Sequence, residues 1–238
     1  MTRSLACGLV KKWSTFATAS AATFAALAGH GRPDLFEVGT PPWSPLSKEV
    51  AHLGGVSWRF GPHNGHDLAT EEGAVKIVAA IRQHRPKNVW LAVPCGEQKM
   101  LAQKRHRSEK MLANALVVAT EALKLGANVH DEYPSYHDSR ETPTRRTLRE
   151  QLHEARFDGC TASVRTSEGK LIRKSWTILT SSERMAEVMN KRRGGGHAHA
   201  NVKEGSWAST DFYPKAMVKK IATVIMEKPR YDGLYEET

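Results

Sequence analysis

Short, largely apolar runs alternate with helical segments along the chain. The runs have the length of strands and cover Leu35–Val38 and residues 56–60, 89–93 and 127–129. Residues 89–93 are apolar without interruption, which is typical of a strand buried on both faces of a parallel sheet. Strands that alternate with helices predict an α/β fold with a doubly wound, mostly parallel sheet.

Helix signals lie between these runs. Residues 71–83 carry apolar side chains at helical spacing and begin with acidic residues, which favour the positive end of the helix dipole. Ser108 is expected to cap a long helix that ends at Gly126, and Ser47 a short helix that runs to Gly54.

The pattern changes in the last third of the chain. Residues 160–165 and 176–180 have strand character and flank a turn at residues 167–169, which predicts an antiparallel hairpin at the edge of the sheet. Two further helices are expected, over residues 182–190 and 215–227.

Residues 1–33 have a composition of their own, without Asp or Glu and with a run of Ala, Ser and Thr over residues 14–28. A disordered polar arm, an organelle transit peptide and a secretory signal are all open for this segment. We therefore divide the chain into the arm at 1–33, an α/β domain at 34–228 and a short tail at 229–238.

Composition narrows the function classes. The 238 residues contain 35 Lys and Arg against 25 Asp and Glu, a net charge of +10 that favours an anionic partner such as nucleic acid. The longest weakly polar stretch, residues 16–28, is interrupted by hydroxyl side chains, so we expect no membrane span. Three widely spaced cysteines predict no disulfide framework and favour a nuclear or cytoplasmic location, with organelle targeting left open.

Ligands of an open parallel sheet bind beyond the carboxyl ends of its strands, where several residues form motifs. Residues 34–39, Asp-Leu-Phe-Glu-Val-Gly, resemble the first motif of class I methyltransferases that use S-adenosylmethionine. Pro94 and Cys95 resemble the Pro-Cys motif of the C5-cytosine methyltransferases, and Glu132 stands where that family keeps a glutamate. The resemblance implies a Rossmann-like methyltransferase domain.

A closer resemblance covers residues 34–220 and is to a methyltransferase-like region of algal, especially dinoflagellate, retrotransposon polyproteins. It is carried by short motifs in the same order, at residues 158–160, 173–180 and 196–199. The resemblance implies a retroelement origin for the chain.

Methylation of cytosine at C5 requires a nucleophile that adds to the ring and an acid near N3. Cys95 is the candidate nucleophile and Glu132 the candidate acid. The alternative for Cys95 is a small apolar side chain packed in the core, because free cysteines are among the most buried residues.

The resemblance implies S-adenosylmethionine as cofactor. The positions that match its binding motifs are Phe36, Gly39, Asp67 and Pro94. The first loop departs from the family, because Gly39 is its sole glycine and two prolines follow at positions 41 and 42. Residues 61–64, after the second strand, also lack the carboxylate that holds the ribose in the family.

Cys160, His197 and His199 are potential zinc ligands. The retroelement relatives carry a cysteine shortly before the histidine pair, where this chain has Lys and Arg at residues 191–193. A four-ligand set is therefore incomplete, so we expect no metal and interpret the histidines as part of an exposed polar loop.

Basic residues cluster after the two candidate catalytic positions. The candidate nucleic-acid contacts are Lys104, Arg105, Arg107, Arg145 and Arg146. A basic rim of this kind attracts phosphates, and a solvated surface without a partner is the alternative.

Two functional hypotheses follow. The first is a retroelement-derived methyltransferase domain of the C5-cytosine type that acts on nucleic acid and is either active or catalytically degraded. The second is a non-catalytic basic module that binds nucleic acid.

Overall fold

The computed structural model describes residues 31–93, 102–135, 138–166, 168–172, 174–192, 194–200 and 213–227. The strands are β1 Leu35–Val38, β2 Ser57–Phe60, β3 Asn88–Leu91, β4 Asn128–Pro134, β5 His153–Asp158 and β6 Ser175–Thr180. The helices are α2 Pro45–His52, α3 Glu71–His84, α4 Ala102–Lys124, α5 Pro143–Arg149, α6 Glu183–Met189 and α7 Lys215–Met226. Short 3-10 turns occur at η3 Pro62–Asn64, η4 Asp138–Glu141 and η5 Gly159–Ala162.

The six strands form one sheet in the order β2-β1-β3-β4-β6-β5. β2, β1, β3 and β4 are paired in parallel, whereas β6 pairs antiparallel with β4 on one side and β5 on the other. β6 therefore runs against the direction of the other five strands of the sheet. The expected doubly wound, mostly parallel, Rossmann-like sheet with an antiparallel hairpin at its edge is confirmed.

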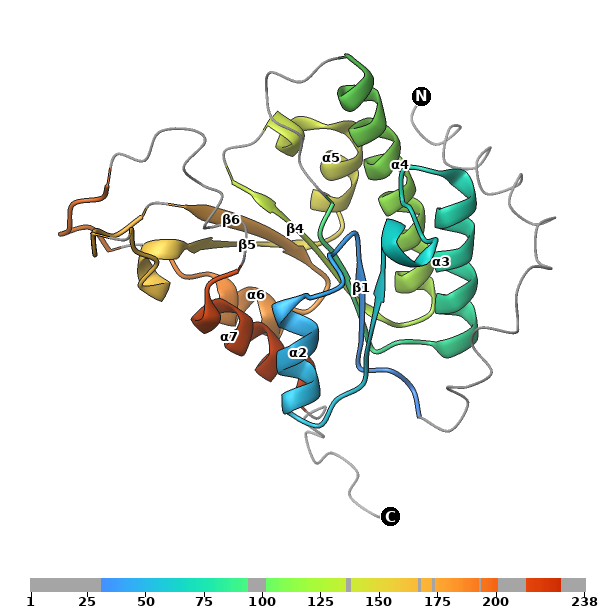
Figure 1. Cartoon of the computed structure of the whole chain (residues 1–238), viewed down its shortest axis with the longest axis horizontal. Coiled ribbons are helices and arrows are strands. Elements are labelled where there is room, and N and C mark those ends of the chain that lie inside the picture. The colour runs from blue at the N-terminus through green and yellow to red at the C-terminus, as the bar shows by residue number, and fades with distance from the viewer. Residues whose placement is uncertain are drawn as a thin grey trace, which may run out of the picture.

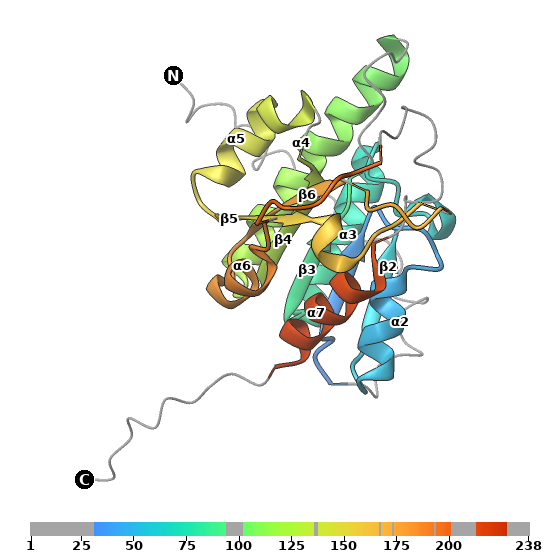
Figure 2. The ribbon, with the colours of Figure 1, turned by 90° about the vertical axis from the view of Figure 1, so that its left-hand side faces the viewer.

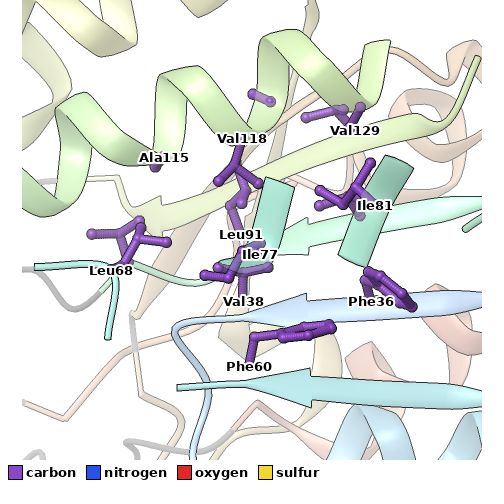
Figure 3. Close-up of a cluster of buried hydrophobic side chains, with 14 of the residues drawn as sticks. Phe36, Val38, Phe60, Leu68, Ile77, Ile81, Leu91, Ala115, Val118 and Val129 are labelled. Carbon is purple, nitrogen blue, oxygen red and sulfur yellow. The ribbon is translucent and has the colours of Figure 1, made fainter. Parts of the chain in front are cut away.

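Helices cover both faces of the sheet (Figures 1 and 2). One face packs against α3, α4 and α5 through a core that includes Phe36, Ile77 and Val129 (Figure 3). The other face packs against α2, α6 and α7 through a core that includes Trp90 and Ile221. Side chains of a strand alternate between faces, so adjacent residues of one strand belong to different cores.

α3 illustrates how the local sequence produces these layers. Thr70 caps the helix by accepting a hydrogen bond from the Gly73 amide, and the acidic pair at its start favours the helix dipole. Ile77 and Ile81 lie fully buried on its inner face, and burial of each stabilises the fold by about 1.5–3 kcal/mol. Gly73 is required because a Cβ there would overlap the backbone of Asp67.

The first strand of the hairpin differs from the expectation. β5 occupies His153–Asp158, whereas residues 160–165 begin with the η5 turn. In β5 the buried Ala155 and Phe157 alternate with polar side chains. Two apolar residues are too few for the period-two pattern of a strand to be recognised in the sequence. The second strand, β6, lies where the sequence predicted it.

Other boundaries also differ. α2 begins at Pro45 and is capped by Ser44, so Ser47 lies within the helix and is not its cap. α4 begins at Ala102, so Ser108 lies within the helix and is not its cap. β4 continues to Pro134, so Glu132 lies inside a strand that was expected to end earlier. The helix expected over residues 182–190 is confirmed as α6, with Ser182 as its cap.

The proposed arm up to residue 30 and the tail from residue 229 fall outside the described residues. In the part of the chain that the structure describes, no helix combines the length and apolar character needed to cross a bilayer.

Candidate active site

Glu132 lies at one end of a buried polar chain on the α2/α7 face of the sheet. The phenol of Tyr213, just before α7, donates a hydrogen bond of 2.6 Å to Glu132 Oε2. The indole Nε1 of Trp90, on β3, donates to the phenol oxygen at 3.2 Å. The sheet order places β3 beside β4, so the three groups form a chain of hydrogen bonds that links the two strands to Tyr213.

Burial controls the protonation of Glu132 and Tyr213 in this chain of hydrogen bonds. Desolvation raises the pKa of Glu132 to about 7, against the opposing effect of the hydrogen bond from Tyr213. Burial and the nearby Glu132 charge raise the pKa of Tyr213 well above its ordinary value, so the phenol keeps its proton. Glu132 is therefore a carboxyl group that exchanges a proton near neutral pH, as acid–base chemistry requires.

A second buried carboxyl group, Glu37 on β1, lies on the same face. Ser44 donates to Glu37 Oε1 at 2.7 Å, and Ser47 donates to Oε2. Ser44 also caps α2 by accepting a hydrogen bond from the Leu46 amide. Burial raises the pKa of Glu37, and its charge also raises the pKa of Tyr213. Glu37 and Glu132 thus approach Tyr213 from two strands.

Asp131 and Arg145 form a buried ion pair on the opposite face. Arg145 Nε contacts Asp131 Oδ2 at 3.0 Å, and its guanidinium lies 4.0 Å from the centre of the Tyr133 ring. The Arg145 side chain has no exposed surface. The expectation that Arg145 contacts nucleic acid is therefore wrong, because the strand alternation of β4 turns Asp131 inward to hold it.

The predicted residues Asp67 and Arg107 lie together. Arg107 Nη2 contacts Asp67 Oδ2 at 2.7 Å, and Asp67 Oδ1 accepts a hydrogen bond from the Ala69 amide. Both carboxylate oxygens of the proposed cofactor contact are thus used within the protein.

Two candidate cofactor positions lie on the first strand and its loop. Phe36 is fully buried, with its ring centre 5.2 Å from Trp58 and 4.8 Å from Phe60. It points to the α3 side of the sheet (Figure 3), whereas Glu132 bonds Tyr213 on the α7 side. Gly39 has a φ of 81°, a left-handed conformation that favours glycine.

The remaining predicted residues are described only in part. Pro94 and Cys95 lie outside the described residues, because the described segment that contains β3 ends at the buried Val93. Lys104 and Arg105 lie in the first turns of α4, but their side chains fall outside the description. The side chain of Arg146 is 63% exposed, 3.8 Å from Glu141, so it remains a candidate for phosphate contact.

Sequence reasoning missed Trp90, Tyr213 and the bonded role of Glu37. Tyr213 is separated from Trp90 by 123 positions and from Glu132 by 81, so no local motif links them. Glu37 stood in the resemblance motif, and an acidic residue inside a short apolar strand was a signal for a buried, hydrogen-bonded carboxyl group.

No protein-family model matches the sequence, and no curated protein matches it. Among solved structures, the chain is similar to the crystal structure of the S. pombe Dnmt2 methyltransferase, with 13% sequence identity and a TM-score of 0.40. The match covers 68% of this chain and 57% of that one, so the chain spans less than two-thirds of that structure.

Proposed function

We propose that this chain is a methyltransferase-like domain of the C5-cytosine type that acts on nucleic acid and derives from a retroelement. The observation that carries the proposal is Glu132, a buried carboxyl group with a pKa of about 7, on the strand beside the one that leads toward Cys95. Carboxyl ends of parallel strands share one edge of the sheet, where ligands of such folds bind.

The chemistry assigns one step to each residue. The Cys95 thiolate adds to C6 of the cytosine ring, and the electron pair displaced from the C5–C6 bond moves toward C5 and N3. Protonated Glu132 stabilises that charge by donating to N3. Tyr213 occupies Oε2, so in this proposal Oε1 meets the base.

The described residues do not offer S-adenosylmethionine the contacts that the family's motifs imply, because their polar groups bond within the chain. Asn64, which follows β2, is used locally: its Oδ1 accepts from the Gly61 amide and its Nδ2 donates to the Arg59 carbonyl. Asp67 is paired with Arg107, and Glu37 is held by two serines.

This misfit favours a second candidate, the non-catalytic nucleic-acid-binding module. It keeps the fold and the net charge of +10 and needs no cofactor. In that case Glu132 and Tyr213 are structural partners, and Cys95 is a packed side chain.

Calorimetric titration of the purified chain with S-adenosylmethionine separates the two candidates. Binding heat supports the methyltransferase, and no heat at millimolar concentrations of cofactor supports the binding module.

If the cofactor binds, an oligonucleotide that contains 5-fluorocytosine is expected to trap a covalent adduct. The adduct is expected to be lost in Cys95→Ser and kept in the matched variant Cys7→Ser. An adduct that survives Cys95→Ser would exclude Cys95 as the nucleophile.

A further inference from the structure

Three metal-binding side chains from two distant segments meet at the rim of the hairpin. Cys160 belongs to η5, whereas His197 and His199 follow α6 by several residues. One ligand atom of each lies within 4.8 Å of the others, and the two imidazole Nε2 atoms are 3.1 Å apart. The sequence identified the same three residues but predicted no metal.

The backbone holds the histidine segment against the hairpin at both of its ends. The Asp158 amide donates to the Lys191 carbonyl at 3.0 Å, and the Ala200 amide donates to the Leu171 carbonyl at 2.8 Å. His197 and His199 are two residues apart, the spacing that places side chains on one side of an extended chain. Their convergence on Cys160 thus follows from main-chain contacts that are independent of the imidazoles.

The geometry of the three ligands fits a tetrahedral ion. Zinc lies about 2.0–2.1 Å from imidazole nitrogens, which places two such nitrogens roughly 3.3 Å apart in a tetrahedron. The observed 3.1 Å between the Nε2 atoms is close to this separation. One thiolate with two imidazoles is a donor set that selects zinc over calcium or magnesium, which prefer oxygen ligands.

The burial of the ligands differs across the cluster. Cys160 is 7% exposed, beneath the turn, whereas His197 is exposed. An ion at the centre of the three would therefore have protein on its thiolate side and solvent on its imidazole side. Among the described residues the cluster has three ligands, the number typical of zinc sites that keep a position open to water.

We propose that Cys160, His197 and His199 bind one zinc ion, with water as the fourth ligand. The ion fastens the segment of residues 194–200 to η5 and so completes the rim of the β5–β6 hairpin. This site is distinct from the one proposed for methyl transfer, because its ligands belong to η5 and to the segment after α6, whereas Glu132 belongs to β4.

Metal titration of the chelator-treated full chain tests the proposal. We expect one equivalent of zinc to bind with a micromolar or tighter dissociation constant and to raise the melting temperature. Cobalt(II) in place of zinc is expected to produce a thiolate-to-metal charge-transfer band and visible bands of tetrahedral intensity. Absence of both the zinc stoichiometry and the cobalt band would overturn the proposal.

Variants distinguish the three ligands from other metal-binding side chains. Cys160→Ser is expected to lose the charge-transfer band, and His197→Asn to weaken zinc binding at least tenfold. His197→Cys is expected to keep one equivalent of zinc and to strengthen the band, because the ion then has two thiolates. His52→Gln, which changes an exposed histidine on α2, is the matched control and is expected to bind zinc as the parent does.

His197→Cys keeps the proposal testable if Cys160→Ser fails to fold, because position 197 is exposed. A band that persists unchanged in folded Cys160→Ser, or fails to increase in His197→Cys, would contradict the assignment of the ligands.

Discussion

The phenol of Tyr213 donates a hydrogen bond of 2.6 Å to the carboxylate of Glu132 and so joins the segment before α7 to β4. This bond stabilises the ionised carboxylate, whereas burial favours the protonated acid. These opposing effects set the pKa of Glu132 at about 7. A change at Tyr213 is therefore expected to shift this pKa.

Replacement of Tyr213 by Phe is expected to raise the pKa of Glu132 further, because the ionised carboxylate loses its donor. It is also expected to lower the free energy of unfolding by about 1–3 kcal/mol, the cost of leaving a buried polar group without its partner. Carboxyl NMR titration and urea unfolding measure the two effects. The control is Trp43→Phe, which changes an exposed aromatic side chain; a pKa of Glu132 that stays the same in Tyr213→Phe would contradict the assigned bond.

The stability of the domain is expected to fall as pH rises through neutrality. The pKa of Glu132 is about 7 in the folded chain against an ordinary value of 4.5, so the folded state binds more protons between these values. The contribution of Glu132 is fully present below pH 4.5 and is lost as pH rises through 7.

Glu132→Gln removes this titration. Relative to the parent, it is expected to gain on the order of 1–3 kcal/mol in unfolding free energy between acidic pH and about pH 8. Urea unfolding across that pH range measures the difference. A parent and variant whose stabilities follow parallel pH profiles would show that Glu132 is not the titrating group.

Removal of the buried charge at position 145 is expected to be costly. Arg145→Met leaves Asp131 buried without its partner and is expected to lower the unfolding free energy by about 3–5 kcal/mol. The double variant Asp131→Leu/Arg145→Met is expected to recover much of that loss, because no isolated charge remains. A loss in Arg145→Met as small as that in Arg146→Gln would contradict the buried pairing.

Loss of the Arg146 side chain is expected to have little effect on stability, in contrast to loss of Arg145. The exposed Arg146 side chain contacts Glu141 at the long distance of 3.8 Å, so Arg146→Gln is expected to change the stability by less than about 1 kcal/mol. If it touches a phosphate, the variant binds nucleic acid more weakly, and the slope of log affinity against log salt becomes shallower by about one unit. Fluorescence anisotropy at several salt concentrations measures this slope, and an unchanged slope would remove Arg146 from the interface.

The sequence predicted most of the α/β layers because their signals are local. The four parallel strands follow from short apolar runs, with β4 longer than expected, and α3 follows from apolar periodicity. β5 was misplaced because four of its six residues are polar and its inward alternation becomes clear only beside β6. Ser108 resembled a cap although helix packing extends α4 past it.

The candidate site was predictable to a smaller extent. Glu132 was identified by its place near the end of a strand, and Cys160, His197 and His199 by their ligand chemistry. Arg145 was assigned to a surface because clustered arginines are usually solvated, yet Asp131 draws it inward. Trp90 and Tyr213 carry no local signal of their partnership.

By itself, the sequence determined the α/β class, the basic charge and the side chains able to transfer protons or bind metal, because these depend on residue type and short spacing. The tertiary structure alone decided which of those groups meet and which are desolvated. Burial raises the pKa of Glu132. The packing of distant segments pairs Arg145 with Asp131 and brings Cys160 to His197 and His199. These properties depend on distance and solvent exposure, which arise only when segments far apart in the chain pack together.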